Sequence, residues 1–467
     1  MPRTKIICTI GPASESPESI RELIKGGMDV ARLNFSHGSR GEHGEKIQII
    51  RRISEELGRP VAILQDLAGP KIRVGSVPEP GVRLETGQTF ILTSEEVDGF
   101  YDRVSVSYAG LPSEVEKGNR ILISDGTIEL IVKEVRNSEI YCEVVTGGLL
   151  TSHKGLNLPT RTIRTPSFTE VDREDLLFGI EHDVDYVALS FVRRSGEILE
   201  AKEVIRERKA DIPVIAKIEQ HEALEYIDEI IEAADGIMVA RGDLGVEIPL
   251  EDVPVIQKKL IQQANVLGKP VITATQMLRS MIDSPRPTRA EAADVANAVL
   301  DGTDAVMLSE ETASGRYPVK AVQFMVRIVT SAERYFSHQR YLQRVPSKEV
   351  PESVAHAACI LADHLEASAV VAPTHSGQTA RYISRFRPKQ PIIALSSNQK
   401  VVQRLALFWG CIPQLVPEPR DTDDMIDTST RSALETGLVS RGDVVVITAG
   451  HPVGVVGSTN MVRVKTV

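Results

Sequence analysis

Cysteine and aromatic residues are scarce in this chain. Among its 467 residues there are four cysteines and one tryptophan, and aromatic residues make up 4% of the total. The cysteines form no CxxC pair, which argues against a disulfide framework and against a structural zinc site. A chain of this length buries enough apolar surface to fold without crosslinks, and its length suggests about three domains.

Long apolar runs and excess positive charge are also lacking. No apolar run approaches the ~20 residues that cross a bilayer, and the opening segment, MPRTKIICTIGPAS, shows no secretory signal. The formal net charge is -10, which disfavours nonspecific binding to nucleic acid. We therefore expect a soluble, cytoplasmic protein with neither nucleic acid nor membrane as a partner.

Short apolar runs recur through the first two thirds of the sequence. Eight of them are continuous, as in strands that are buried on both faces of a sheet. Charge-rich stretches of helical length separate most of them, for example at 42–57, 196–209, 251–267 and 289–300. This repetition predicts an α/β protein with a (β/α)8 TIM barrel, and an open doubly wound sheet is the alternative. The predicted strands are 6–10, 30–35, 61–64, 185–191, 213–218, 236–240, 270–274 and 305–308.

The connection between the third and fourth runs is much longer than the others. It is β-rich, and Asp125 and Gly126 stand between two apolar runs, as in a hairpin. We expect an inserted small β-barrel lid domain over 71–167, with strands at 83–93, 120–123, 128–135 and 141–146. The catalytic barrel then occupies 1–70 and 168–335. A polar linker at 337–353 opens a C-terminal α/β domain, 336–467, for regulation or assembly, with strands at 369–372, 392–395 and 444–448.

Polar side chains cluster at the C-terminal ends of the predicted strands, where the functional groups of such barrels lie. One charged residue at a strand end is more often solvated than catalytic, but that reading does not explain so many together. Alternation places Lys217 and Glu219 on one face of the fifth strand, and Arg241 and Asp243 on one face of the sixth. The residues at these ends are Arg32, Asn34, Ser36, His37, Asp66, Lys217, Glu219, Arg241, Asp243, Thr275, Gln276, Ser309 and Glu310.

These residue types favour one kind of chemistry. Two carboxylates, Glu219 and Asp243, without nearby cysteine or histidine suit Mg²⁺ or Mn²⁺. The cations Arg32, Arg73 and Lys217 suit a phosphate-bearing substrate. A divalent metal and fixed cations, without a nucleophile–base pair, indicate phosphoryl transfer or enolate chemistry. No Walker-type or GxGxxG loop is present.

Several segments resemble the pyruvate kinase family, in order along nearly the whole chain. That family has a barrel, an inserted β lid and a C-terminal α/β domain, and its members commonly form homotetramers. The resemblance therefore implies transfer of the phosphoryl group of phosphoenolpyruvate to ADP, which gives ATP and pyruvate. The segments are TKIICTIGPAS, MDVARLNFSHG, LQDLAGPKIRVG, GLNLP, IAKIEQHEA, MVARGDLGVEIP and the long run from Val271 to Pro318.

The resemblance also implies roles for individual residues. Glu219 and Asp243 match the metal ligands, Lys217 the cation that stabilises the transferring phosphoryl group and the enolate, and Arg32 the phosphate clamp. The remaining matches are Gly242, Asp243 and Thr275 for the substrate carboxylate, Ser190 and Ser309 for the pocket, and Arg73, Pro12 and His37 for the nucleotide. Thr275 with an ordered water is a candidate for protonating the enolate. Two positions depart from the family pattern: Val171 stands where many relatives have lysine, and Glu310 where glycine is commoner.

A second cation site is expected to be vestigial. Asn34, Ser36, Asp66 and the carbonyl of Leu67 match the K⁺ ligands of K⁺-dependent relatives. Those relatives have glutamate where this chain has Lys71, whose ammonium can replace the ion and repel it. We therefore expect no K⁺ requirement. The alternative is that Lys71 merely points to solvent at the lid hinge.

The segment 372–380 resembles the family's effector loop. In relatives that fructose 1,6-bisphosphate activates, lysine and arginine stand where this chain has His375 and Gln378. We expect a weak response to that ligand or none, while a monophosphate effector stays open. The alternative is an ordinary helix cap. The expected phosphate-holding residues are Thr374, Ser376, Gly377 and Thr379.

Two other functions remain open from the residues alone. A metal-dependent pyruvate lyase or aldolase-type barrel would also need a carboxylate pair and an arginine. A non-catalytic metabolite sensor would need the fold, but it would not need these charged residues to be intact.

Overall fold

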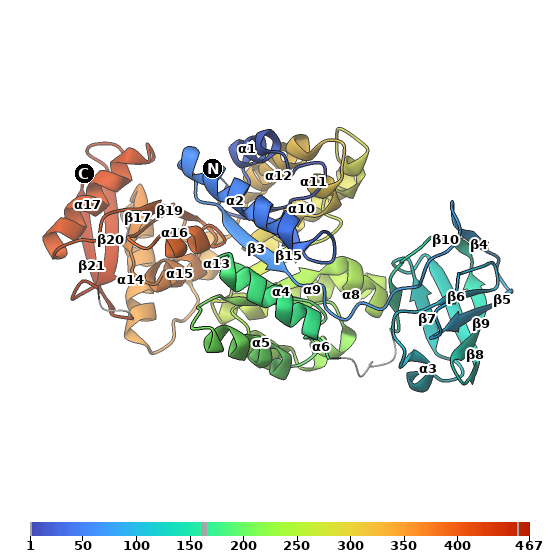
Figure 1. Cartoon of the computed structure of the whole chain (residues 1–467). Coiled ribbons are helices and arrows are strands. Elements are labelled where there is room, and N and C mark those ends of the chain that lie inside the picture. Colours follow the sequence, from blue (N-terminus) through green and yellow to red (C-terminus); the bar gives the residue numbers. More distant parts are fainter. Residues whose placement is uncertain (1, 160–165, 455–456) are drawn as a thin grey trace.

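The computed structural model describes residues 2–159, 166–454 and 457–467. Three bodies lie in a row in Figure 1, with the barrel in the centre, the lid at one end and the C-terminal unit at the other. The predicted lid includes residues 160–165, which lie outside the described residues. Every helix in the described ranges is too short or too polar to cross a membrane.

The central body is a closed barrel of eight parallel strands. The open-sheet alternative is wrong, because the first strand pairs with the last, Lys5 opposite Ala305. Each strand overlaps a predicted one. Their order around the barrel is β1 (Lys5–Thr9), β16 (Ala305–Leu308), β15 (Val271–Ala274), β14 (Gly236–Ala240), β13 (Val214–Ile218), β12 (Tyr186–Leu189), β3 (Ala62–Asp66) and β2 (Val30–Asn34).

Helices cover the outside of this barrel with their apolar faces. Capping boxes start three of them, at Ser39, Thr169 and Thr288, because each side chain accepts the N–H three residues on. The long helices are α1 (Pro17–Gly26), α2 (Arg40–Glu56), α4 (Glu170–Glu181), α5 (Ser195–Glu207), α9 (Val253–Val266), α10 (Arg289–Asp301) and α12 (Pro318–Glu333). The short ones are α6 (His221–Glu225), α7 (Ile227–Ala233), α8 (Arg241–Glu247), η1 (Leu250–Asp252), η2 (Arg279–Ile282) and α11 (Glu310–Ala313).

The lid contains a six-stranded sheet, a two-stranded sheet and the short helix α3 (Leu111–Glu114). The predicted hairpin is present: β7 pairs with β8 across a turn in which Asp125 and Gly126 have positive φ. The single strand predicted at 83–93 is wrong, because a turn at Gly87 divides it between the two sheets. The sheets are β11 (Leu156–Asn157), β7 (Arg120–Ile123), β8 (Ile128–Arg136), β9 (Glu139–Thr146), β5 (Thr89–Thr93) and β6 (Arg103–Ser105), and separately β10 (Gly148–Leu150) with β4 (Val82–Leu84).

The C-terminal unit is a five-stranded sheet with helices on it. The sequence prediction missed β19 and β21, because Pro413 interrupts the first pattern and the second alternates with exposed side chains. A helix, α13 (His338–Leu342), occupies part of the predicted linker. The strands are β19 (Cys411–Leu415), β18 (Ile392–Ser396), β17 (Ala369–Pro373), β20 (Val444–Gly450) and β21 (Thr459–Thr466), with α14 (Val350–His364), α15 (Gln378–Arg385), α16 (Gln399–Leu405) and α17 (Thr422–Glu435).

The C-terminal unit closes the bottom of the barrel. Leu407 packs among the inward-facing barrel side chains. Arg387 is fully buried and donates to both carboxylate oxygens of Asp304, at 2.8 Å each, and to Asn265 Oδ1 at 2.8 Å. This closure leaves the C-terminal ends of the strands as the open end of the barrel.

Candidate active site

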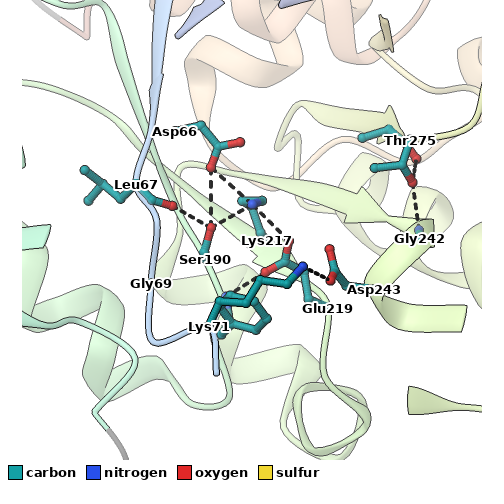
Figure 2. A network of polar contacts seen from close by, with 12 residues as sticks. Asp66, Leu67, Gly69, Lys71, Ser190, Lys217, Glu219, Gly242, Asp243 and Thr275 are labelled. Carbon is teal, nitrogen blue, oxygen red and sulfur yellow. Dashed lines mark hydrogen bonds and ion pairs between the residues drawn. The ribbon is translucent and has the colours of Figure 1, made fainter. Parts of the chain in front are cut away.

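Four charged side chains meet, buried, at this open end. Asp66 accepts from Arg32 Nε at 2.7 Å and lies 3.1 Å from Lys217 Nζ, and the same ammonium lies 2.9 Å from Glu219 Oε1. Figure 2 shows Lys217 between the two carboxylates. The residues come from β2, β3 and the end of β13, so the expected convergence of Lys217 and Glu219 is present in the structure.

The charges in this cluster support one another. Burial alone would raise the pKa of Asp66, but Lys217 and Arg32 outweigh it and hold that pKa below its usual value. Burial alone would lower the pKa of Lys217, but Asp66 and Glu219 raise it above its ordinary value. The cluster therefore presents a permanent ammonium in a site with little water, where a fixed charge acts most strongly.

The segment after β12 fixes the orientation of this ammonium. Ser190 Oγ accepts from Lys217 Nζ at 2.7 Å and donates to the carbonyl of Leu67 at 2.7 Å. Phe191, with φ of 55°, donates its N–H to Glu219 Oε2 at 2.8 Å. Lys217 and Glu219 thus each have a second anchor besides their charged partner.

The predicted shared face of Arg241 and Asp243 is wrong. Strand β14 ends at Ala240 and the chain turns directly into α8, so the strand's alternation does not reach these residues. Arg241 donates to the carbonyls of Ala274 and Thr275, at 3.2 and 2.7 Å. It therefore supports the chain after β15 instead of lining the site beside Asp243.

Thr275 lies in the turn that Arg241 supports. Its φ is 68° and that of Gln276 is 56°, values that are uncommon for residues other than glycine. Its hydroxyl accepts from the N–H of Gly242 at 2.7 Å and donates to the carbonyl of Ala274 at 2.7 Å. The turn thereby joins the end of β15 to the first turn of α8.

Glu219 and Asp243 are the residues that could hold a divalent cation. Burial is the first cause of the raised pKa of Glu219, and the negative charge of Asp243 adds to it. A pair of carboxylates that repel each other favours a divalent cation between them. In the described ranges no group of three or more acidic, histidine or cysteine side chains could hold a metal. Two protein ligands fit Mg²⁺ or Mn²⁺, which take their other ligands from water and substrate.

Lys71 occupies a position that sequence reasoning missed. Its Nζ lies 2.9 Å from Asp243 Oδ1, so it does not simply point to solvent. The expected K⁺ ligands lie on the neighbouring strands: Asn34 stands opposite Asp66 in the register of β2 and β3, and its Oδ1 accepts from the N–H of Ser36 at 3.2 Å. Only the folded hinge brings Lys71 to Asp243, since they are far apart in the sequence.

Helix α8 also contacts β11 of the lid. Asn157, in β11, donates to Glu247 Oε1 at 3.2 Å, and the other oxygen of Glu247 lies 3.0 Å from His221 Nδ1. Lys71 on the outgoing connection contacts Asp243 in the first turn of the same helix. Residues near both ends of the lid therefore contact the helix that carries Asp243, which no sequence motif predicts.

His37, one of the expected nucleotide-side residues, lies within electrostatic range of Arg32 in the cluster. Burial is the largest cause that lowers the pKa of His37, and the cations Arg73, Arg32 and Lys71 add to it, so this histidine shares their surroundings. Arg73 donates to the carbonyl of His153 in the lid at 3.1 Å. Pro12 is exposed after β1.

The remaining predicted positions differ in their surroundings. Ser309 precedes α11, and its buried hydroxyl has no hydrogen-bond partner in the described ranges. Glu310 and Val171 are exposed. The effector-loop residues lie apart from the cluster, on the segment from β17 into α15: Thr374, Ser376 and Thr379 border a cavity of the C-terminal unit, and Ser376 and Gly377 border a second cavity between that unit and the barrel. There Gly377 donates its N–H to Thr374 Oγ1 at 3.0 Å, and the hydroxyls of Thr379 and Thr459 are 2.7 Å apart.

Replacing Lys71 tests the proposed metal position. Lys71→Ala removes an ammonium that competes with a cation for Asp243, so Mn²⁺ should bind several-fold more tightly than in the wild type. Titration followed by the electron paramagnetic resonance of free Mn²⁺ measures this. Lys117→Ala removes an exposed lid lysine as a control and should change nothing. Equal or weaker binding in Lys71→Ala would contradict the assignment.

Comparison with known proteins agrees with this geometry. The family model for the pyruvate kinase barrel domain matches residues 1–322, and that for the pyruvate kinase alpha/beta domain matches residues 352–465. Pyruvate kinase of Geobacillus stearothermophilus is 49% identical over the whole chain, which covers 80% of that relative. Those of Staphylococcus aureus (strain MRSA252) and Bacillus licheniformis are 48% and 46% identical, again over the whole chain and 81% of each relative. Both domain models and the full-length identity lead to one conclusion: the chain belongs to the pyruvate kinase family.

Proposed function

We propose that the chain transfers the phosphoryl group of phosphoenolpyruvate to ADP, which gives ATP and pyruvate. The observation that carries this proposal is the buried ammonium of Lys217, held between Asp66 and Glu219 beside Arg32. Negative charge develops on the phosphoryl and enolate oxygens during such a transfer, and a fixed ammonium stabilises it without reorganisation.

Arg32 is the proposed phosphate clamp. Its Nε is bound to Asp66, and its Nη1 donates to Thr9 Oγ1 at 3.0 Å. Within the described part of the chain its Nη2 has no partner, so this nitrogen is free to donate to a phosphate oxygen. The two anchored nitrogens keep the guanidinium plane in place, which lowers the entropy lost on binding.

The substrate carboxylate is proposed to lie at the first turn of α8. The N–H groups of a helix's first turn lack intrahelical acceptors and favour an anion. The N–H of Gly242 in this turn donates to Thr275 Oγ1 at 2.7 Å, so a substrate carboxylate would take this donor over from the hydroxyl beside it. We retain Thr275 with a water as the candidate that protonates the enolate, and Ser190 and Ser309 as pocket residues.

Glu219 and Asp243 would hold Mg²⁺ or Mn²⁺, and the ion, when bound, neutralises substrate oxygens. The residues proposed for the nucleotide side are Arg73, Pro12 and His37. Val171 offers no cation there, because it is an exposed apolar side chain in the first turn of α4. A homotetramer and a cytoplasmic location remain predictions.

The lyase and the sensor are less well supported. A lyase has no use for ADP, and the lid of this chain, with Arg73 within electrostatic range of His37, supports a nucleotide instead. A sensor would not need Lys217 to be held by three polar partners. Formation of pyruvate that depends on ADP separates the kinase from both.

The role of Lys217 is tested by Lys217→Met. Loss of this charge should lower kcat by about 10²–10³-fold or more, because it stabilises the transition state. Steady-state turnover measures the effect, and circular dichroism checks that the variant folds. Lys348→Met, at an exposed position of the C-terminal unit, serves as the control. Turnover close to that of the wild type in Lys217→Met would refute the assignment.

We further propose that the enzyme needs no K⁺. Lys71 places a fixed positive charge beside Asp243 and within electrostatic reach of His37, at the mouth that also contains Asn34, Ser36 and Asp66. Turnover in tetramethylammonium buffer should change little when about 100 mM KCl is added, a concentration that also screens exposed charges.

Lys71→Glu is the companion variant for this proposal. It changes the local charge in the direction that favours a cation, so turnover should become dependent on K⁺. Stimulation of the wild type by K⁺ of about tenfold or more would show that Lys71 does not replace the ion.

Fructose 1,6-bisphosphate is expected to have little effect. The loop that carries Thr374, Ser376, Gly377 and Thr379 offers hydroxyl and N–H donors but no lysine or arginine, and charge-assisted hydrogen bonds are about twice as strong as neutral ones. Titration of this ligand at subsaturating phosphoenolpyruvate tests the expectation. A several-fold gain in substrate affinity at micromolar ligand would overturn it.

A further inference from the structure

A second polar cavity lies at the other end of the barrel. Its walls come from α5 and the segment before β13 on one side, and from α15 and α16 of the C-terminal unit on the other. Tyr186, the first residue of β12, and Asp235, just before β14, also line it. The cavity therefore borders the N-terminal ends of the strands, away from the cluster around Lys217. The C-terminal unit meets the barrel at the end opposite to the lid (Figure 1).

Arg381 lines this cavity without a counterion. Its side chain is half-buried, its Nε is fully buried, and its guanidinium forms no hydrogen bond or ion pair with any residue in the described ranges. The ring of Phe408, whose centroid is 5.3 Å from the guanidinium carbon, is its neighbour. A partly buried cation without an anionic partner is unfavourable, so an anion in the cavity would be stabilised.

Other cations surround the same space. Lys202 Nζ lies 2.9 Å from Asp235 Oδ2, and Arg404 Nη1 lies 2.9 Å from Asp211 Oδ2. Arg206 lines the cavity as well, and its own ion pair is with an exposed glutamate outside it. Two carboxylates thus face four cations, Arg381 included, and the cavity has an excess of positive charge.

Lys269 lies outside the lining of the cavity, within electrostatic range of two of its cations, Lys202 and Arg381. Burial is the largest cause that lowers its pKa; Asp235 opposes the shift, and repulsion from Lys202 and Arg381 adds to it.

Most of the remaining lining is apolar, apart from Tyr186 and from Ser376 and Gly377 of the loop before α15. Ile205 and Ile212 of the barrel face Val401, Leu405 and Phe408 of the C-terminal unit. A bare inorganic anion would leave this wall uncovered, whereas a small organic molecule would bury it. We propose that the cavity binds a small phosphate-bearing organic molecule, with its phosphate at Arg381 and Lys202 and its carbon skeleton on the apolar wall.

A phosphate group carries more negative charge and more acceptor oxygens than a carboxylate, so it can bind an arginine and an ammonium at once. An arginine fork donates in parallel to two phosphate oxygens, and an ammonium adds a point charge beside it. A phosphate bound in this cavity would also link the barrel to the C-terminal unit, since Lys202 belongs to α5 and Arg381 to α15. The inference does not depend on the catalytic proposal, because no residue of the active site lines this cavity.

Equilibrium dialysis with radiolabelled inorganic phosphate at low ionic strength tests the phosphate subsite on the full chain. Phosphate is also expected at the active site and could bind at the effector loop, so the comparison is between variants. Arg381→Gln should lose one phosphate per subunit, with an affinity at that site at least tenfold weaker. Arg381→Lys keeps the charge and should keep most of the binding, which separates loss of charge from misfolding. Arg136→Gln, an exposed lid arginine, should match the wild type.

Two results would overturn the proposal. One is identical phosphate binding in the wild type and Arg381→Gln. The other is displacement by acetate at equal ionic strength as effective as displacement by unlabelled phosphate, which would reduce the cavity to a general anion site. Retained turnover in Arg381→Gln is expected in either case, so failure here leaves the catalytic proposal untouched.

Discussion

Buried charge at the open end of the barrel has to be compensated, and the site is organised around that requirement. Asp66 is ionised because Lys217 and Arg32 face it, and Lys217 stays charged because Asp66 and Glu219 flank it. Removal of any one member would leave an uncompensated charge in a place with little water. These side chains keep one another ionised. The same side chains would contact a phosphate ester and a divalent cation.

The fold brings this cluster together through the register of parallel strands. Asp66 ends β3 opposite Asn34 at the end of β2, and Lys217 reaches the same level from β13. Helix α8 then adds Asp243 and accepts contacts from both connections of the lid. The lid thereby contacts the carboxylate that is proposed to hold the metal. The C-terminal unit acts at the opposite end, where Leu407 and Arg387 seal the barrel.

The sequence predicted the barrel because continuous apolar runs and amphipathic helices alternate regularly over the first two thirds of the chain. The alternation of Lys217 and Glu219 was equally readable, since both lie on or directly after one strand. The same rule failed for Arg241, where the strand stops at Ala240 and a helix begins at once. The pairing of Lys71 with Asp243 could not be predicted, because it depends on how the hinge folds back over α8. Arg381 and Arg404, the charged residues of the C-terminal unit that line the second cavity, belong to no sequence motif, since their charges matter only once the two units are packed together.

The central claim is that the charged cluster and a divalent cation together transfer a phosphoryl group from phosphoenolpyruvate to ADP. The most direct measurement is pyruvate formation by the purified chain, with ADP and Mg²⁺ each omitted in turn. The account predicts turnover only when both are present, and its recovery when Mg²⁺ is added back after chelation. Pyruvate formation that continues without ADP, or at an unchanged rate after removal of divalent cations, would contradict it.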